Sequence, residues 1–175
     1  MKYTFIAISL ILTSLTACVG GESAPSTENT NHETSPTENV KEEGTTSEED
    51  GVVEITIESN DQMKYNLSEI RAKAGSTVVL TLVNVGTMPK EAMGHNWTLL
   101  NAGVDHEEYA SAAESAKDND YQVIGRESDV IAHTAILGPG ETETITFTAP
   151  AAGLYKYVCT FPAHYGTMNG TLIVE

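Results

Sequence analysis

Short segments in which apolar and polar residues alternate dominate the chain from residue 52 onward, and this period of two restricts that region to β structure. The clearest are residues 52–58 (VVEITIE) and 76–84 (STVVLTLVN), each with one apolar face. Further strands are predicted at 96–100, 130–137, 141–148, 154–160 and 171–174. Glycine, proline and asparagine separate these segments. Short strands at regular spacing with turn residues between them predict a β-sandwich or a Greek-key barrel.

One segment departs from this pattern. Residues 105–117 (DHEEYASAAESAK) are rich in alanine and glutamate, with acidic residues at the start and a lysine at the end. Acidic residues near the N-terminus of a helix and basic residues near its C-terminus interact favourably with the helix dipole. We therefore predict a short helical insertion between two strands.

The first residues have the composition of an export signal. Lys2 is followed by an apolar run at 3–12 that is short for a membrane span, and then by small and hydroxylated residues. The run ends in Leu15-Thr16-Ala17-Cys18, which resembles the lipobox of bacterial lipoproteins, in which the cysteine becomes an acylated N-terminus. We expect a lipoprotein signal peptide at 1–17 and lipidation of Cys18, which would anchor the protein to a membrane. The alternative is an ordinary secretory signal with an incidental cysteine.

Residues 18–51 are interpreted as the lipidated cysteine and a disordered acidic tether. From residue 19 the segment contains nine acidic residues, one lysine, no aromatic residue and only three apolar side chains. Such a segment cannot bury enough apolar surface to offset the entropy lost on ordering. Residues 52–175 remain as a single domain with enough chain for one core.

The charge of the chain argues against one class of partner. It has 25 acidic and 9 basic residues, for a formal net charge of −16, and no cluster of lysine and arginine. Nucleic acid binding relies on such clusters. We therefore expect no nucleic-acid partner.

The stretch 159–168 (CTFPAHYGTM) combines three metal-binding side chains at the spacing Cys-x4-His-x3-Met. A thiolate, an imidazole and a thioether suit copper better than zinc or a hard cation. His95 is the best candidate for a second imidazole, because it begins an apolar stretch and follows Gly94, which lets a backbone carbonyl approach a metal. We also expect Gly166 to permit a tight turn in the loop. These residues predict a mononuclear copper site.

Several segments, in this order, resemble the azurin and auracyanin branch of the small blue copper proteins, or cupredoxins. They are Asn60-Asp61-Gln62-Met63, Met88-Pro89-Lys90, Met93-Gly94-His95-Asn96-Trp97, Val130-Ile131-Ala132-His133-Thr134 and Cys159-Thr160-Phe161-Pro162 with His164 and Met168. The resemblance implies an all-β, eight-stranded Greek-key sandwich with a helical flap.

The resemblance also implies roles for individual residues at one type 1 copper. His95, Cys159 and His164 would be the equatorial ligands, and Met168 the long axial one. The Gly94 carbonyl would be a distant contact on the opposite side. Asn96 would hold the ligand loop by hydrogen bonding. Apart from the resemblance, we expect Phe161, Met93 and Trp97 to form an apolar shell that excludes water.

The expected function is that of a one-electron carrier, not an enzyme, exported to the periplasm or the cell surface. Its partners would be redox proteins such as cytochromes or a copper or haem oxidase or reductase. They would dock on an apolar rim around His164, formed by Met63, Met88, Ala92, Met93, Phe161, Pro162 and Ala163. The alternative is a copper storage or delivery module, although such modules often carry methionine- or histidine-rich runs that this sequence lacks. A copper oxidase or reductase would need further histidine clusters, whereas His32, His106 and His133 each occur singly.

Overall fold

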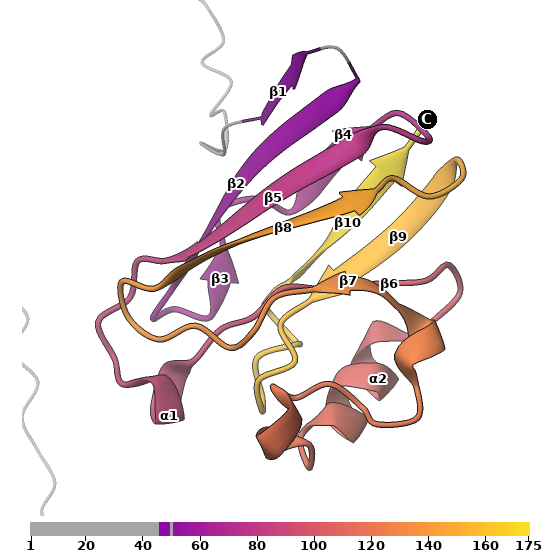
Figure 1. The fold of residues 1–175 in the computed structure, drawn as a ribbon. Helices are drawn as coiled ribbons and strands as arrows, with labels where there is room; N and C mark the ends of the chain where they lie inside the picture. Colours follow the sequence, from indigo (N-terminus) through magenta and orange to yellow (C-terminus); the bar gives the residue numbers. More distant parts are fainter. Residues whose placement is uncertain (1–45, 50) are drawn as a thin grey trace, which may run out of the picture. The chain divides into compact units, whose positions relative to one another are not determined.

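The computed structural model describes residues 46–49 and 51–175. The predicted signal peptide, Cys18 and most of the predicted tether lie outside the described residues. The strands are β1 (Thr46–Glu49), β2 (Val52–Asn60), β3 (Lys64–Tyr65), β4 (Glu69–Ala72), β5 (Thr77–Asn84), β6 (Thr98–Leu100), β7 (Val130–His133), β8 (Thr142–Thr148), β9 (Gly153–Val158) and β10 (Asn169–Val174). The helices are α1 (Lys90–Met93), α2 (His106–Ala113) and the two 3₁₀ turns Lys117–Asn119 and Glu127–Asp129. Figure 1 shows the strands as two sheets, with the helices gathered at one end.

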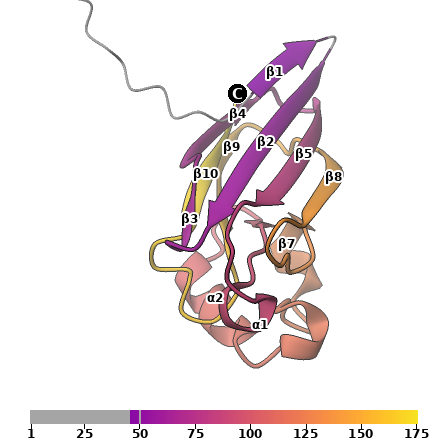
Figure 2. The same cartoon turned by 90° about the vertical axis from the view of Figure 1, so that its left-hand side faces the viewer.

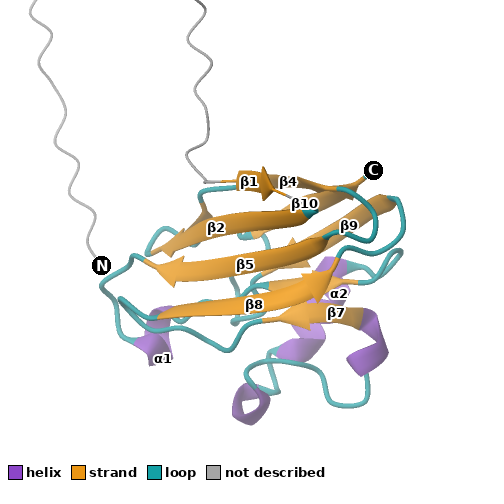
Figure 3. Cartoon of the chain, turned by 45° about the horizontal axis from the view of Figure 1, so that its top comes forward, coloured by secondary structure: helices purple, strands orange, loops and turns teal. Residues whose placement is uncertain are grey.

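The two sheets are mixed and form a sandwich. The first has the strand order β1-β2-β5-β8, with β3 also paired to β2, and the second has the order β4-β10-β9-β6-β7. The pairs β2–β5 and β4–β10 are parallel, whereas the others are antiparallel. Figure 2 shows the two layers from the side, and Figure 3 shows that strands make up most of both. The predicted β-sandwich is confirmed.

The structure has ten described strands, against the eight that the resemblance implied and the seven segments predicted from the sequence pattern. The three strands without a predicted segment are β4, the two-residue β3 and β1, which lies within the segment predicted as a tether. β1 pairs antiparallel with the outer edge of β2, with Thr46 opposite Ile55 and Glu49 opposite Val52. An unpaired strand edge offers free N–H and C=O groups to neighbouring chain, whatever the side chains of that chain are. Four residues of the segment predicted as a tether therefore form a strand, while the domain boundary at residue 51 stays a prediction.

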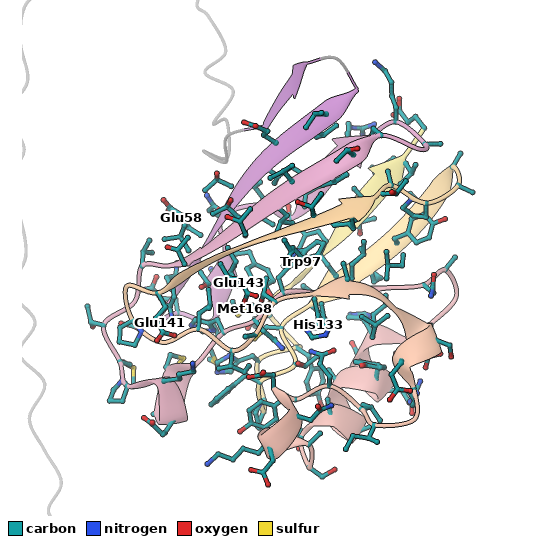
Figure 4. The ribbon with its side chains drawn as sticks, viewed as in Figure 1. Glu58, Trp97, His133, Glu141, Glu143 and Met168 are labelled. Atoms are coloured by element: carbon teal, nitrogen blue, oxygen red, sulfur yellow. The ribbon has the colours of Figure 1, made fainter. Side chains whose placement is uncertain are left out.

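The core lies between the sheets and follows from the alternation in the sequence. Every second residue of β2 and β5 is at most 2% exposed: Val53, Ile55, Ile57, Val78, Leu80 and Leu82. Trp97 fills the centre, with ring centroids 5.8 Å from Phe147 and 5.5 Å from Tyr157. In Figure 4, Trp97 lies between the two layers. Each fully buried large apolar side chain contributes roughly 1.5–3 kcal/mol, so these residues hold the sheets together.

The predicted helical insertion is confirmed between β6 and β7. Asp105 caps α2, because its carboxylate accepts hydrogen bonds from the N–H groups of Glu107 (2.9 Å) and Glu108 (3.2 Å). The buried face of α2 includes Tyr109 and Ala110, which belong to the same apolar cluster as residues of β6 and β9. The helix ends at Ala113, four residues before the predicted end. Among the described residues, no helix has the length and apolar character needed to cross a membrane.

Candidate metal centre

Backbone hydrogen bonds fold the loop between β9 and β10 so that its ends meet. The N–H of Cys159 donates to the carbonyl of Met168 at 2.9 Å. The carbonyl of His164 accepts from the N–H groups of Thr167 (3.1 Å) and Met168 (2.9 Å), and the N–H of His164 donates to Phe161 at 3.1 Å. The three side chains singled out by the Cys-x4-His-x3-Met spacing are thus fixed by one short, hydrogen-bonded loop.

His95 comes from a distant part of the chain, just before β6. Its N–H donates to the carbonyl of Leu137 (3.0 Å), and its carbonyl accepts from the N–H of Leu137 (2.7 Å). The buried Asn84 side chain donates to the same Leu137 carbonyl at 3.1 Å. At Gly94, a Cβ atom would lie 2.5 Å from Ile136 Cγ2 and 2.7 Å from the Lys90 carbonyl oxygen. The backbone on both sides of His95 is therefore closely constrained.

The structure brings the four predicted side chains together. One donor atom each from His95, Cys159 and His164 lies within 4.8 Å of the other two. The Sγ of Cys159 is 3.6 Å from Nδ1 of His164, and the two imidazole rings are 5.0 Å apart between centroids. Met168 belongs to the same apolar cluster as Cys159 and is completely buried. In Figure 4, Met168 lies below Trp97, toward the end of the sandwich that carries the helices.

The protonation chemistry of this cluster fits a metal ion. Both ring nitrogens of His95 are buried without a hydrogen-bond partner among the described residues, whereas buried polar atoms are normally paired. Burial lowers the pKa of His95, and burial together with the nearby His95 lowers the pKa of His164 to about 4. Both imidazoles are therefore neutral at pH 7, which is the form that coordinates metals.

Burial raises the pKa of Cys159 to about 12. Hydrogen bonds from the backbone N–H groups of Asn96 and Phe161 and from the Tyr65 side chain oppose this rise. A metal cation must therefore displace the thiol proton, and its binding releases that proton. Two neutral imidazoles, one thiolate and one thioether are the donors of a blue copper site.

Asn96 holds the ligand loop, as predicted. Its side-chain oxygen accepts from the N–H of Thr160 at 2.8 Å, and its amide nitrogen donates to Thr160 Oγ1 at 2.7 Å and to the carbonyl of Asp120 at 3.2 Å. Gln122 was not singled out from the sequence. Its side chain donates to Thr98 Oγ1 at 2.9 Å and, at 3.5 Å, to Thr160 Oγ1 in the ligand loop, and it accepts from the Tyr109 hydroxyl at 3.3 Å. A buried polar chain thus links α2 to the loop. The bonded residues are 13 to 64 positions apart in sequence, so no local motif reveals this chain.

The apolar surroundings of the ligands differ from the prediction. Phe161 does belong to them, with its ring 4.7 Å from that of His164 and 5.2 Å from that of Tyr121. Ile136 and Ala113 complete the buried cluster around Cys159 and Met168. Trp97, however, belongs to the main core instead, because it follows Asn96 into the space between the sheets. Ala113 and Tyr121, from the helical insertion between β6 and β7, therefore supply apolar contacts that had been predicted for Trp97.

The strained position of the ligand loop is Ala163, not Gly166. Ala163 has a φ of +65°, while Gly166 has no positive φ and no neighbour that a Cβ atom would contact within 4 Å. A non-glycine residue in the left-handed region costs of order 1–3 kcal/mol and persists only where its surroundings require it. Here Ala163 directly precedes His164, so the strained peptide is the one that orients this ligand. The predicted role of Gly166 is wrong.

Comparisons with known proteins agree with this site. Residues 51–175 match the family described as copper binding proteins, plastocyanin/azurin family. The chain is 39% identical over 123 residues to azurin from Achromobacter denitrificans, covering 68% of this chain and 82% of that protein. It is 40% identical over 118 residues to outer membrane protein H.8 from Neisseria gonorrhoeae, covering 66% of this chain and 63% of that protein.

Among solved structures, auracyanin A, a "blue" copper protein from Chloroflexus aurantiacus, superposes with a TM-score of 0.65 and 35% identity. This match covers 71% of this chain and 99% of that one. The family match includes all four predicted metal-binding side chains, and the structure gathers them in one buried cluster. The chain therefore belongs to the plastocyanin/azurin family of copper-binding proteins, with a type 1 copper site formed by His95, Cys159, His164 and Met168.

Proposed function

We propose that this protein carries single electrons between redox proteins. The observation that carries the proposal is the rigid burial of the donor set, in which His95, Cys159 and Met168 have no exposed surface and His164 is only 2% exposed. Copper held there supplies a change between Cu(I) and Cu(II). Ligands fixed by the fold limit the rearrangement that accompanies this change, which favours rapid electron transfer.

The same observation argues against copper storage or delivery. A delivery module needs ligands that an acceptor can reach, so that the metal can be exchanged. Here the four donor side chains are at most 2% exposed, and the backbone of His95 and of the ligand loop is hydrogen-bonded. The test is the rate at which a Cu(I) chelator removes the metal. We expect loss to be far slower than electron exchange with an external redox reagent, whereas comparable rates would favour delivery.

We further propose the individual roles at the metal. His95, Cys159 and His164 act as the equatorial ligands and Met168 as the weak axial ligand. The carbonyl of Gly94 would be a distant contact on the opposite side. The close packing around Gly94 supports this last role, because it fixes the peptide that carries the carbonyl. Copper-edge X-ray absorption of the loaded protein, or its crystal structure, tests the ligand set.

Partners are proposed to dock on the apolar rim, formed by Met63, Met88, Ala92, Met93, Phe161, Pro162 and Ala163. Hydrogen bonds join the segments that form the rim. Thr167 Oγ1, in the ligand loop, donates to the Met63 carbonyl. The carboxylate of Asp61 accepts from the N–H groups of Thr87 and Met88. Met88 is 40% exposed, so the rim presents apolar surface to solvent.

The rim is also nearly neutral within an acidic domain. Residues 52–175 contain 16 acidic and 7 basic residues, for a net charge of −9. The segments 88–99 and 158–168 contain only Lys90 and Glu91 as charged residues, and Lys90 pairs with Glu141 at 3.3 Å. A small neutral patch suits brief encounters with redox proteins such as cytochromes or a copper or haem oxidase or reductase.

The docking proposal is tested by placing a charge on the rim. Ala163→Asp is suitable because Asp tolerates a positive φ better than most residues. We expect slower electron self-exchange, measured by NMR line broadening, with an unchanged copper spectrum. Glu54→Lys on the exposed face of β2 is the matched control and should exchange at the parent rate. Docking on the rim is refuted if Ala163→Asp exchanges as fast as the parent and Glu54→Lys alone changes the rate.

The N-terminal segment is proposed to export and anchor the domain. Residues 1–17 act as a signal peptide, Cys18 carries the lipid, and the acidic residues that follow act as a tether to the domain at a periplasmic or cell-surface membrane. The lipobox-like sequence supports this, as does the relative that is itself named an outer membrane protein. Cys18→Ala should move the protein to the soluble fraction without altering the copper spectrum. Retention in the membrane fraction would mean that another segment provides the anchor.

A further inference from the structure

A cavity of about 380 Å³ lies between β7 and the helical insertion, and none of the four metal-binding side chains lines it. In Figure 4, His133 projects from β7 on the side of the helical turns. The lining that matters here is apolar at Val123, Val130 and Ile131 and polar at Asp120, Glu127 and His133. Cavities of roughly 300–1,000 Å³ that combine apolar walls with a few polar groups are typical of small-molecule sites.

Hydrogen bonds hold the acidic part of this cavity in place. The carbonyl of Asp120 accepts from the side chain of Asn96 at 3.2 Å, and its carboxylate accepts from the N–H of Ile136 at 3.3 Å. The carboxylate of Glu127 accepts from the N–H of Gly125 at 2.9 Å. Both acids are therefore positioned before any ligand enters, and binding there loses little conformational freedom.

The polar groups of the cavity favour a ligand that donates hydrogen bonds. A carboxylate has about four acceptor positions, so Asp120 and Glu127 can each accept from a further donor. Nδ1 of His133 lies 3.2 Å from the carbonyl of Thr134, which can only accept. In the neutral imidazole, Nδ1 is then the donor and Nε2 remains as another acceptor.

The charges around the cavity favour a cation. No lysine or arginine of the described residues lines it. Arg126, next to Glu127 in the chain, is already paired with Glu108 at 2.8 Å and with Asp129 at 2.7 Å. The domain as a whole, with 16 acidic and 7 basic residues in 52–175, has a net charge of −9, which attracts cations from solution.

A bare metal ion fits this cavity poorly. It would leave the apolar lining uncovered, and among the described residues only His95, Cys159 and His164 come together as three metal-binding side chains. We propose instead that the cavity binds a small organic cation. Its ammonium group would lie against Asp120 and Glu127, and its apolar body would cover the apolar lining. This proposal does not depend on the electron-transfer function proposed above.

The test is a titration of the metal-free, full-length protein with phenethylammonium, followed by NMR of the backbone amides. We expect the largest shifts at residues 120–127 and 130–133. Phenethyl alcohol keeps the apolar body and replaces the ammonium by a hydroxyl, so it should bind about tenfold more weakly, as expected when two exposed ion pairs are lost. n-Butylammonium, which reproduces a lysine side chain, should also bind more weakly, because it covers less of the apolar lining.

Two substitutions test the carboxylates. Asp120→Asn and Glu127→Gln keep an acceptor for the N–H groups of Ile136 and Gly125 and remove only the charge, and asparagine also tolerates the φ of +49° at residue 120. Each should weaken binding of phenethylammonium about threefold, and both together about tenfold. Asp118→Asn is the matched control, because it removes the same charge from an exposed residue outside the lining. It should leave the affinity unchanged.

The inference is overturned if phenethylammonium causes no shifts at millimolar concentrations, if the shifts lie away from the cavity, or if phenethyl alcohol binds as tightly. These measurements use the native protein, so they decide the question even if a variant does not fold. An equal loss of affinity in Asp118→Asn would mean that only the overall charge attracts the probe. Equal binding of n-butylammonium would exclude a free small molecule as the specific ligand and indicate a lysine side chain of another protein instead.

Discussion

Replacing Asn96 with alanine should destabilise the metal-free protein through the ligand loop. Asn96 and Thr160 are both completely buried, and two of the three side-chain hydrogen bonds of Asn96 go to Thr160. In Asn96→Ala the N–H of Thr160 loses its acceptor, while its hydroxyl keeps a long contact of 3.5 Å with Gln122. The Asp120 carbonyl belongs to an exposed residue, so water can replace the lost amide. One buried donor without a partner and one lost hydrogen bond together cost about 2–4 kcal/mol.

The assay is urea unfolding of the metal-free protein. Asn101→Ala serves as the control, because the Asn101 side chain makes one hydrogen bond, to the Ser128 carbonyl at 2.7 Å, in an exposed position. The control should lose no more than about 1 kcal/mol. The copper-loaded Asn96→Ala protein should also bleach and re-oxidise at a changed potential. If Asn96→Ala and Asn101→Ala lose the same stability and the potential is unchanged, Asn96 does not hold the ligand loop.

Three further substitutions test other parts of the site. Met168→Gln should keep the copper but lower the midpoint potential, because an amide oxygen is a harder donor than a thioether and favours Cu(II). We expect a fall of at least about 59 mV, which is a tenfold change in the relative affinity of the site for Cu(I) and Cu(II). An unchanged potential in voltammetry would exclude Met168 from coordination. Gly94→Ala should cost about 1–3 kcal/mol in urea unfolding through overpacking against Ile136, whereas Gly166→Ala, with no atom in reach, should cost nothing; equal losses would refute the packing argument. Hydrogen bonds from the loop at residues 87–88 lower the pKa of Asp61 below its ordinary value of 3.8, so the stability that the Asp61 carboxylate contributes is present above that value and is lost as pH falls through the folded pKa. Asp61→Asn should therefore unfold more easily than the parent at pH 7, whereas the two proteins should have similar stability in strong acid. A stability difference that persists at low pH would contradict this.

Local patterns in the sequence were sufficient for the ligands and most of the sandwich. The spacing from Cys159 to Met168 could be interpreted because three ligands share one loop, and the alternation at β2 and β5 follows directly from one-sided burial. β1 could not be predicted in this way. Its strand depends on the free edge of β2 and not on its own acidic residues.

The supporting residues escaped prediction for a different reason. Gln122 acts through contacts with residues distant in sequence, so its neighbours in the chain carry no signal of its role. The positive φ of Ala163 is likewise imposed by the hydrogen bonds that close the loop. Glycine is the usual residue at such a φ, and its presence at Gly166 therefore indicated the wrong position.

Two acidic residues at the surface, one in β8 and one in the turn before it, also make contacts that could not be predicted from the sequence. From sequence alone, Glu141 and Glu143 look like free charges, and Figure 4 labels both. Instead, Glu141 accepts from the N–H of Gly138 at 2.7 Å, and Glu143 accepts from the N–H of Ala135 at 2.7 Å. Both bonds fix the segment that pairs with His95 through Leu137. Charge reversal at either position would therefore disturb the site as well as the surface charge.

The most direct measurement is the visible absorption spectrum of the copper-loaded protein, recorded with that of Cys159→Ser. A thiolate bound to Cu(II) gives an intense visible charge-transfer band, and the account predicts this band in the native protein, bleached reversibly by a mild reductant. Cys159→Ser should lack the band while its circular dichroism shows a folded domain, because the sandwich core does not depend on this residue. A native protein without the band, or a Cys159→Ser protein that keeps it, would contradict the assignment of the copper site.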